Sequence, residues 1–131
     1  MASIRREITV HRPAEQCWDA LRDVGALHTR LVPGFVTDTR LEDGARIVTF
    51  GNGTVAKELI VDVCDETRRV VWSVVGGSFT HHNASVQVFD EGQGRTRLVW
   101  IADLLPDAIA GRISEMIEQG MRVMGATLER R

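Results

Sequence analysis

Apolar and polar residues alternate along most of the chain, the period typical of strands that bury one face. The first such segment covers residues 4–11. Six more follow from residue 35 onward, and turns rich in Gly, Asn and Asp separate them. These segments are residues 35–41, 45–50, 54–64, 68–75, 80–89 and 95–104. Because consecutive short strands joined by tight turns pair antiparallel, the pattern predicts a seven-stranded antiparallel sheet.

Helical spacing replaces this alternation directly after the first strand. Pro13 suits the first turn of a helix, where a missing N–H costs nothing. Cys17, Trp18 and Leu21 then recur at helical intervals. Residues 26–31 predict a second short helix, so two short helices are expected between the first strand and the second.

The last segment, from Pro106 to the C-terminus near Arg131, predicts one long helix. Its apolar residues fall on one side, and they are Ile109, Ile113, Met116, Ile117, Gly120, Met121, Met124 and Leu128. At 1.5 Å per residue this helix is about 35 Å long, enough to cross a small sheet. The chain therefore predicts an α+β fold with one domain over residues 1–131, in which a curved sheet wraps around the long C-terminal helix.

Gly120 is unusual because it lies in the middle of the apolar stripe, where glycine costs about 1 kcal/mol relative to alanine. Two interpretations are open. In the first, a bulky sheet residue, such as a tryptophan, approaches the helix closely and requires glycine. In the second, glycine leaves empty volume over the sheet, lined by Met116 and Met124, whose flexible side chains repack around different ligands.

Composition and charge narrow the choice of partners. The 131 residues fit one domain, and 44% apolar with 26% charged residues is ordinary for a soluble protein. A net charge of −2 gives no electrostatic reason to bind nucleic acid or an anionic membrane. The start of the chain does not resemble a signal peptide, and no stretch approaches about 18 apolar residues. We therefore expect a cytoplasmic protein without integral membrane association, with Cys17 and Cys64 as buried thiols.

Motifs for metal, nucleotide or classical hydrolase chemistry are absent from the sequence. The four histidines are scattered, and His81 and His82 would point to opposite faces of one strand. There is no Cys-x-x-Cys, His-Glu-x-x-His or Gly-x-Ser-x-Gly motif, and no phosphate-binding loop. The sequence therefore predicts neither a metal site nor a cofactor.

The inner face of the sheet is the remaining place for function. Alternation puts Trp72 and Trp100 under the C-terminal helix, where core packing and ligand contact are compatible roles. On residues 54–64 the apolar set predicts that Leu59 points inward. Lys57 shares that face and would either reach a polar ligand group at the pocket mouth or extend to solvent.

Two residues are candidates for acid–base chemistry. His82 lies on the predicted inner face and would serve as a polar anchor, as a proton-transfer group or only as a structural residue. Asp103 precedes the C-terminal helix, so it would either pair with His82 or cap the first turn of that helix.

The order of elements and four short motifs resemble a known superfamily. The motifs are residues 13–18, the Val-Pro-Gly-Phe step at 32–35, the turn and strand at 65–72, and the strand at 94–100. Together they resemble the helix-grip fold of the birch-pollen-allergen, START and polyketide cyclase/dehydrase-like proteins, often grouped as the SRPBCC superfamily. The resemblance covers essentially the whole chain and implies a ligand cavity between sheet and helix.

The resemblance also implies what the cavity holds. Such proteins bind lipids, polyketides, hormones or sterols, and some catalyse cyclisation or dehydration. Residues 74–85 distantly resemble the latch region of plant abscisic-acid receptors, which would bring Phe79 near the pocket entrance, although the latch signature itself is absent. The residues expected to bind a ligand are His28, Lys57, Leu59, Trp72, Phe79, His82, Ala84, Trp100, Met116, Gly120 and Met124.

Three hypotheses follow for function. In the first, the chain binds a small hydrophobic ligand, lipid- or polyketide-like, between the sheet and the C-terminal helix. In the second, it is a polyketide cyclase, aromatase or dehydratase-type enzyme, with His82, His28, Glu58 and Asp103 as available acid–base groups. In the third, it is an interaction or chaperone-regulator module with a filled core, and a homodimer is possible.

Overall fold

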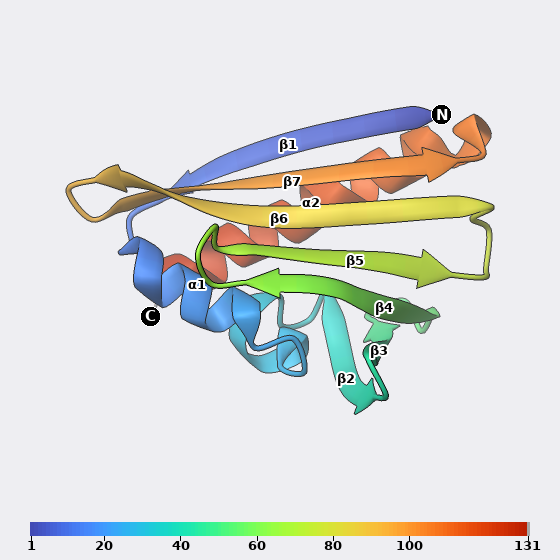
Figure 1. Cartoon of the computed structure of the whole chain (residues 1–131), viewed down its shortest axis with the longest axis horizontal. Helices are drawn as coiled ribbons and strands as arrows, with labels where there is room; N and C mark the ends of the chain where they lie inside the picture. The colour runs from blue at the N-terminus through green and yellow to red at the C-terminus, as the bar shows by residue number, and fades with distance from the viewer. Residues whose placement is uncertain (131) are drawn as a thin grey trace.

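The computed structural model describes residues 1–130, and Arg131, the end of the predicted helix, lies outside the described residues. Its seven strands are β1 (Ala2–Val10), β2 (Val36–Glu42), β3 (Ala45–Phe50), β4 (Val55–Cys64), β5 (Arg69–Val75), β6 (His81–Gly92) and β7 (Arg95–Leu105). They form one antiparallel sheet in the order β1-β7-β6-β5-β4-β3-β2 (Figure 1). Each strand from β2 to β6 pairs with the next one along the chain, and β1 pairs with β7, so the predicted seven-stranded antiparallel sheet is confirmed.

The helices also follow the predicted order. Between β1 and β2 lie α1 (Ala14–Arg22) and η1 (Leu27–Leu31), the latter a single wide turn of π-helix. After β7 a 3₁₀ turn, η2 (Asp107–Ile109), leads into α2 (Ala110–Glu129). The long helix α2 runs across one face of the sheet, and α1 lies near its C-terminal end (Figure 1). This is the helix-grip arrangement of an α+β fold.

The core lies between α2 and the face of the sheet that it covers. Alternate residues of β6 and β7 point toward α2, as predicted, so Val86 and Leu98 are almost completely buried. From the helix, Ile117 and Leu128 belong to the same buried core. Cys17 is buried in the same core, whereas Cys64 is only partly buried, contrary to prediction.

Strand β4 departs from the predicted pattern. Its inner face carries Ala56, Glu58 and Ile60, while Leu59 lies on the outer face and is 39% exposed. A β-bulge after Ile60 places two residues opposite one on β5, so Val63 returns to the inner face. The prediction that Leu59 and Lys57 face inward is wrong, because this strand exposes apolar side chains and buries a carboxylate that has a partner.

Polar contacts fix the elements that surround the inner face. Trp18 on α1 and Arg22 one turn later donate hydrogen bonds to Asp65 in the β4–β5 turn, at 2.9 and 2.8 Å. On β1, Arg6 pairs with Glu118 of α2 at 3.1 Å. These contacts hold α1 against the β4–β5 turn and α2 against the edge strand β1.

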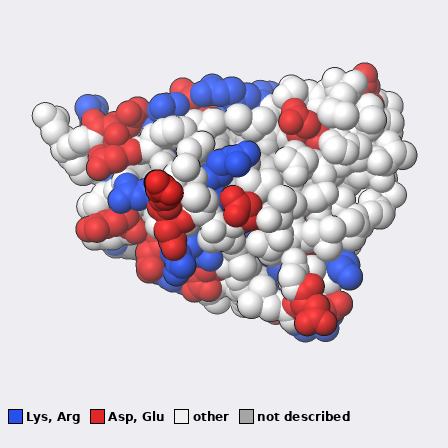
Figure 2. Space-filling model, in the orientation of Figure 1, with Lys and Arg blue, Asp and Glu red and all other residues white. Residues whose placement is uncertain are grey.

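The outer face of the sheet carries charges of both signs. Figure 2 shows Lys and Arg intermingled with Asp and Glu on the face that is turned toward the viewer in Figure 1. The exposed apolar residues of β4, Val55 and Val61, also lie on the outer side, at 60% and 57% exposure.

Candidate ligand-binding cavity

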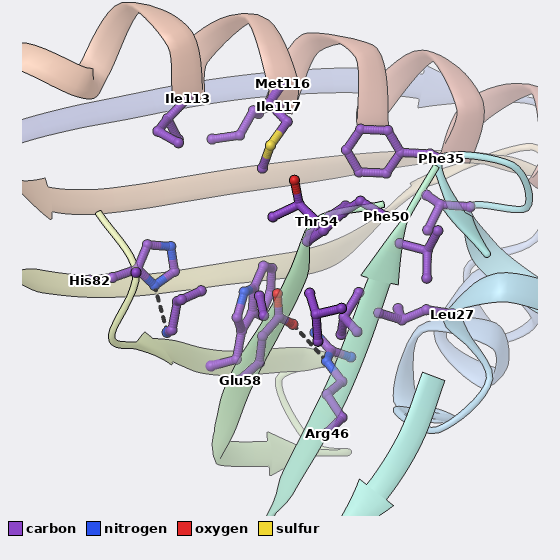
Figure 3. A pocket seen from close by; sticks show the side chains of 18 of the residues that line it. Leu27, Phe35, Arg46, Phe50, Thr54, Glu58, His82, Ile113, Met116 and Ile117 are labelled. Atoms are coloured by element: carbon purple, nitrogen blue, oxygen red, sulfur yellow. Dashed lines mark hydrogen bonds and ion pairs between the residues drawn. The ribbon is translucent and has the colours of Figure 1, made fainter. Parts of the chain in front are cut away.

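A cavity of about 840 Å³ lies between α2 and the inner face of the sheet (Figure 3). Side chains of β3 to β6 form one wall, and Ile113, Met116 and Ile117 of α2 form the facing wall. Leu27 and Leu31 of η1 contribute to a further wall. Pockets that bind small molecules commonly have volumes of about 300–1,000 Å³, so this cavity is large enough for a ligand.

The cavity is bordered by exposed segments on one side, which marks its mouth. The β3–β4 turn contributes Gly51 and Asn52, and the β5–β6 turn contributes residues 76–79. Gly51 has to be glycine because a Cβ would lie 2.5 Å from the carbonyl oxygen of Gly34. This close approach pins the β3–β4 turn beside the segment that enters β2, which sets one lip of the mouth.

Aromatic rings line much of the interior. Phe35 and Phe50 meet edge to face with ring centroids 5.6 Å apart, and Trp72 meets Trp100 in the same way at 5.8 Å. Edge-to-face pairs of this kind stabilise a packed arrangement by about 0.5–1.5 kcal/mol beyond the burial itself. The rings therefore form a firm apolar surface that a ligand can contact.

Gly120 is packed and is not among the residues that line the cavity. A Cβ at this position would lie 3.1 Å from the Trp100 ring and 3.2 Å from Phe35. Glycine therefore permits the close approach of Trp100, which agrees with the first of the two interpretations. The Trp100 indole N–H is buried from solvent in this packing and has no hydrogen-bond partner within residues 1–130.

A buried ion pair lies on the sheet wall. Arg46 of β3 and Glu58 of β4 are directly opposite each other, and Arg46 Nε donates to Glu58 Oε1 at 2.8 Å. The two residues are 3% and 6% exposed. The Arg46 guanidinium also lies over the Trp72 ring, 5.2 Å from its centroid, and donates a long hydrogen bond of 3.4 Å to the Val24 carbonyl.

His82 of β6 also lines the cavity, and its tautomer follows from its hydrogen bond. The backbone N–H of Val74 donates to His82 Nδ1 at 3.0 Å, so a neutral ring carries its hydrogen on Nε2. Burial, with a smaller contribution from the nearby charge of His81, lowers the His82 pKa to about 4. His82 is therefore neutral at pH 7 and presents an N–H donor.

Most predicted ligand contacts do border the cavity. The residues that line it are Trp72, Phe79, His82, Trp100, Met116 and Met124, and Lys57 borders it from the outer face of β4. Ala84 points inward but is covered in the core, while Leu59 and Gly120 do not line the cavity for the reasons given above.

Two further predicted groups lie elsewhere. The imidazole of His28 on η1 contacts Thr39 of β2, with 3.1 Å between Nδ1 and Oγ1, and does not line the cavity. Asp103 is wrong as a partner of His82, because it lies within β7 beside Leu104, the residue that pairs with His82. Adjacent residues of a strand point to opposite faces. Asp103 does not cap α2 either, since η2 and Pro106 intervene.

Sequence reasoning missed Arg46, and named Glu58 only as a possible acid–base group. A signal was present in the hairpin: Asn52 in the β3–β4 turn lies midway between Arg46 and Glu58. Opposite charges equidistant from a hairpin turn fall on the same face of the sheet. That pairing would have placed Arg46 and Glu58 on the same face of the hairpin.

Two classes of site find no support in the part of the chain that the structure describes. No three His, Cys, Asp or Glu side chains of residues 1–130 are grouped so that they would hold a metal ion. Among the helices of the same residues, none is long and apolar enough to span a bilayer.

Comparison with known proteins places the chain in a family. The family model described as "Polyketide cyclase / dehydrase and lipid transport" matches residues 1–130. No curated protein matches the sequence.

Solved structures share the fold over nearly the whole chain. A Thermobifida fusca protein is 25% identical, with a TM-score of 0.79 over 98% of this chain and 91% of its own. A START superfamily protein from Mycobacterium smegmatis is 13% identical, with a TM-score of 0.73 over 98% and 95%. Norcoclaurine synthase from Thalictrum flavum is 19% identical, with a TM-score of 0.75 over 98% and 84%. With its sheet, its long helix and its family match in agreement, the chain belongs to the polyketide cyclase/dehydrase and lipid transport family.

Proposed function

We propose that this protein binds a small hydrophobic molecule, lipid- or polyketide-like, in the cavity between the sheet and α2. The observation that carries the proposal is the cavity itself, about 840 Å³ in volume and walled mainly by apolar and aromatic side chains. Each Å² of apolar ligand surface that leaves water contributes roughly 25 cal/mol, so a ligand that fills such a space gains substantial affinity. The volume also argues against a module with a filled core.

A cavity-filling variant tests this proposal. Ala56 points into the cavity from β4, whereas Leu59 on the same strand points outward. We expect the neutral dye N-phenyl-1-naphthylamine to bind at one saturable site. Ala56→Phe should weaken its affinity at least about tenfold, because the added ring occupies ligand volume. Leu59→Phe adds the same type of ring outside and should leave the affinity unchanged.

The measurement is a fluorescence titration, with circular dichroism to establish that each variant is folded. Dye affinity that is equal in the folded Ala56→Phe and Leu59→Phe variants would mean that the dye binds elsewhere, and the proposal would be wrong.

A second candidate function is proton abstraction from a bound carbonyl compound, as a cyclase-type enzyme requires. The observation that favours it is that Glu58, an acceptor, and His82, a donor, line one cavity. The test is hydrogen–deuterium exchange of the methyl group of 2-acetylnaphthalene in D₂O, followed by mass spectrometry. We expect exchange above the rate in buffer, and its loss in Glu58→Gln. A rate equal to that of buffer would exclude this function for this ketone.

A further inference from the structure

The Arg46–Glu58 pair has hydrogen-bonding capacity that the protein does not use. Arg46 bonds through Nε and Nη1, and Glu58 bonds through Oε1. In residues 1–130 only the Trp100 indole nitrogen is both sealed and unpartnered. Arg46 Nη2 and Glu58 Oε2 have no hydrogen-bond partner in the same residues and are not among the fully buried unpartnered atoms, and both residues line the cavity.

His82 adds a third unused group on the same sheet wall. Its Nδ1 accepts from the Val74 N–H, and its Nε2–H has no hydrogen-bond partner among the described residues. Figure 3 shows His82, Glu58 and Arg46 along the sheet side, opposite the apolar residues of α2. The sheet wall therefore carries three polar groups within a mainly apolar lining, and they face Ile113, Met116 and Ile117 of α2.

The charge of this wall decides which ligand groups it accepts. Arg46 and Glu58 neutralise each other, and His82 is neutral, so the wall has no net charge. The other charged residues at the cavity, Lys57, Arg112 and Glu115, are exposed at its margin. A carboxylate that reaches Arg46 Nη2 would also approach Glu58, and like charges repel strongly where water is excluded. A hydroxyl group, in contrast, accepts from Arg46 and donates to Glu58.

We propose that Arg46, Glu58 and His82 form a polar subsite that selects neutral, oxygen-bearing apolar ligands, with hydroxyl or ketone groups, over carboxylates such as free fatty acids. This inference rests on the proposed function, since it names the class of ligand that the same cavity takes. The hydroxyl group binds the ion pair, and a ketone oxygen accepts from His82 Nε2–H. The apolar frame contacts α2 and the aromatic rings.

Three ligands of one shape test the selection: naphthalene, 2-naphthol and 2-naphthoate, each displacing N-phenyl-1-naphthylamine at pH 7. We expect 2-naphthol to bind at least about fivefold more tightly than naphthalene, and 2-naphthoate to bind most weakly, because hydrogen bonds to charged groups favour the hydroxyl. Glu91→Gln, which alters an exposed ion pair with Arg97 away from the cavity, is the control and should reproduce the wild-type order.

Variants of the pair should change the order in a defined way. Glu58→Gln keeps an acceptor for Arg46 Nε but leaves the guanidinium charge unneutralised, so 2-naphthoate affinity should rise at least about tenfold. If that variant does not fold, Arg46→Met combined with Glu58→Leu removes both charges with little change of volume. Replacing a buried pair by apolar residues is often neutral or stabilising. In the double variant, 2-naphthol and naphthalene should bind within about twofold of each other.

A His82 variant tests the third group of the subsite. His82→Asn retains an oxygen acceptor for the Val74 N–H and removes the Nε2–H donor. We expect it to weaken 2-acetylnaphthalene binding about fivefold and naphthalene binding hardly at all. Equal losses for the two compounds would remove His82 from the proposed subsite.

The possible failures are distinguishable. In one case, the three naphthalene compounds bind equally to the wild type, or 2-naphthoate binds best, while Ala56→Phe still weakens dye binding. The cavity then binds ligands, but the proposed selection is wrong. If none of them displaces the dye and Ala56→Phe has no effect, the proposed function itself fails.

Discussion

At the residue scale, His82 is the histidine whose protonation the fold controls most clearly. Its pKa is near 6.5 when the chain is unfolded and about 4 when burial excludes the charged form. Between these two pH values the unfolded chain binds more protons than the folded chain. Stability from this group is therefore complete above pH 6.5 and is lost as the pH falls toward 4, by up to about 3 kcal/mol.

His82→Asn isolates this contribution, because asparagine does not titrate and can still accept from Val74 N–H. We expect the free energy of unfolding of the wild type to fall relative to that of the variant as the pH is lowered from 7 to 4.5. Urea denaturation at several pH values measures the difference. Parallel pH profiles for the two proteins would contradict the assigned protonation state.

Residue identities were predictable where one physical rule decided them. Trp72, Trp100 and Met124 were placed at the cavity by strand alternation and helical spacing, because apolar burial dominates at those positions. Arg46 was missed because a buried charge is unfavourable until its partner is known. That partner, Glu58, is a cross-strand neighbour. The burial of either residue could therefore be predicted only once the pairing register of β3 and β4 was known.

At the scale of elements, small residues determine how closely α2 approaches the sheet, and Gly120 is one of them. Trp100 and Phe35 occupy the space above Gly120, and a Cβ there would meet them at 3.1 to 3.2 Å. Gly111, on the same helix, is exposed, and a Cβ there would meet nothing within 4 Å. Substitutions at Gly120 and at Gly111 therefore distinguish the effect of packing on stability from the effect of helix propensity.

We expect Gly120→Leu to lower the free energy of unfolding by about 1–3 kcal/mol, because overpacking outweighs the gain of about 1 kcal/mol in helix propensity. Gly111→Leu should gain up to about 1 kcal/mol, since only propensity changes. Urea denaturation, followed by tryptophan fluorescence, measures both. Stabilisation by both substitutions would show that Trp100 and Phe35 yield readily to a larger side chain.

The elements themselves were predictable because turn signals and periodicity agreed at almost every boundary. Strand β3 ends where it was predicted, and most other boundaries differ by one or two residues. The inner face of β4 was predicted wrongly for two reasons. The bulge after Ile60 interrupts the alternation, and the outer face exposes the apolar residues Leu59 and Val61. A bulge has no hydrophobic signature of its own, so a sequence pattern alone does not locate it.

At the scale of the whole molecule, the sheet and α2 enclose a space that their own side chains leave unfilled. Apolar cavities without an occupant are destabilising, because the lining atoms lose dispersion contacts. A ligand that fills the cavity restores those contacts only in the folded state. Binding and folding are therefore thermodynamically linked in this protein.

This linkage predicts a stabilisation that depends on ligand concentration. At a free N-phenyl-1-naphthylamine concentration about 100 times its Kd, the free energy of unfolding should rise by about 2.7 kcal/mol, which corresponds to an increase of several degrees in Tm. Thermal unfolding followed by circular dichroism measures the shift. Leu59→Phe should give the full increase, whereas Ala56→Phe at the same dye concentration should give much less, because its cavity is already occupied. An equal increase in both variants would mean that the stabilising site lies outside the cavity, since only the inner substitution removes ligand volume.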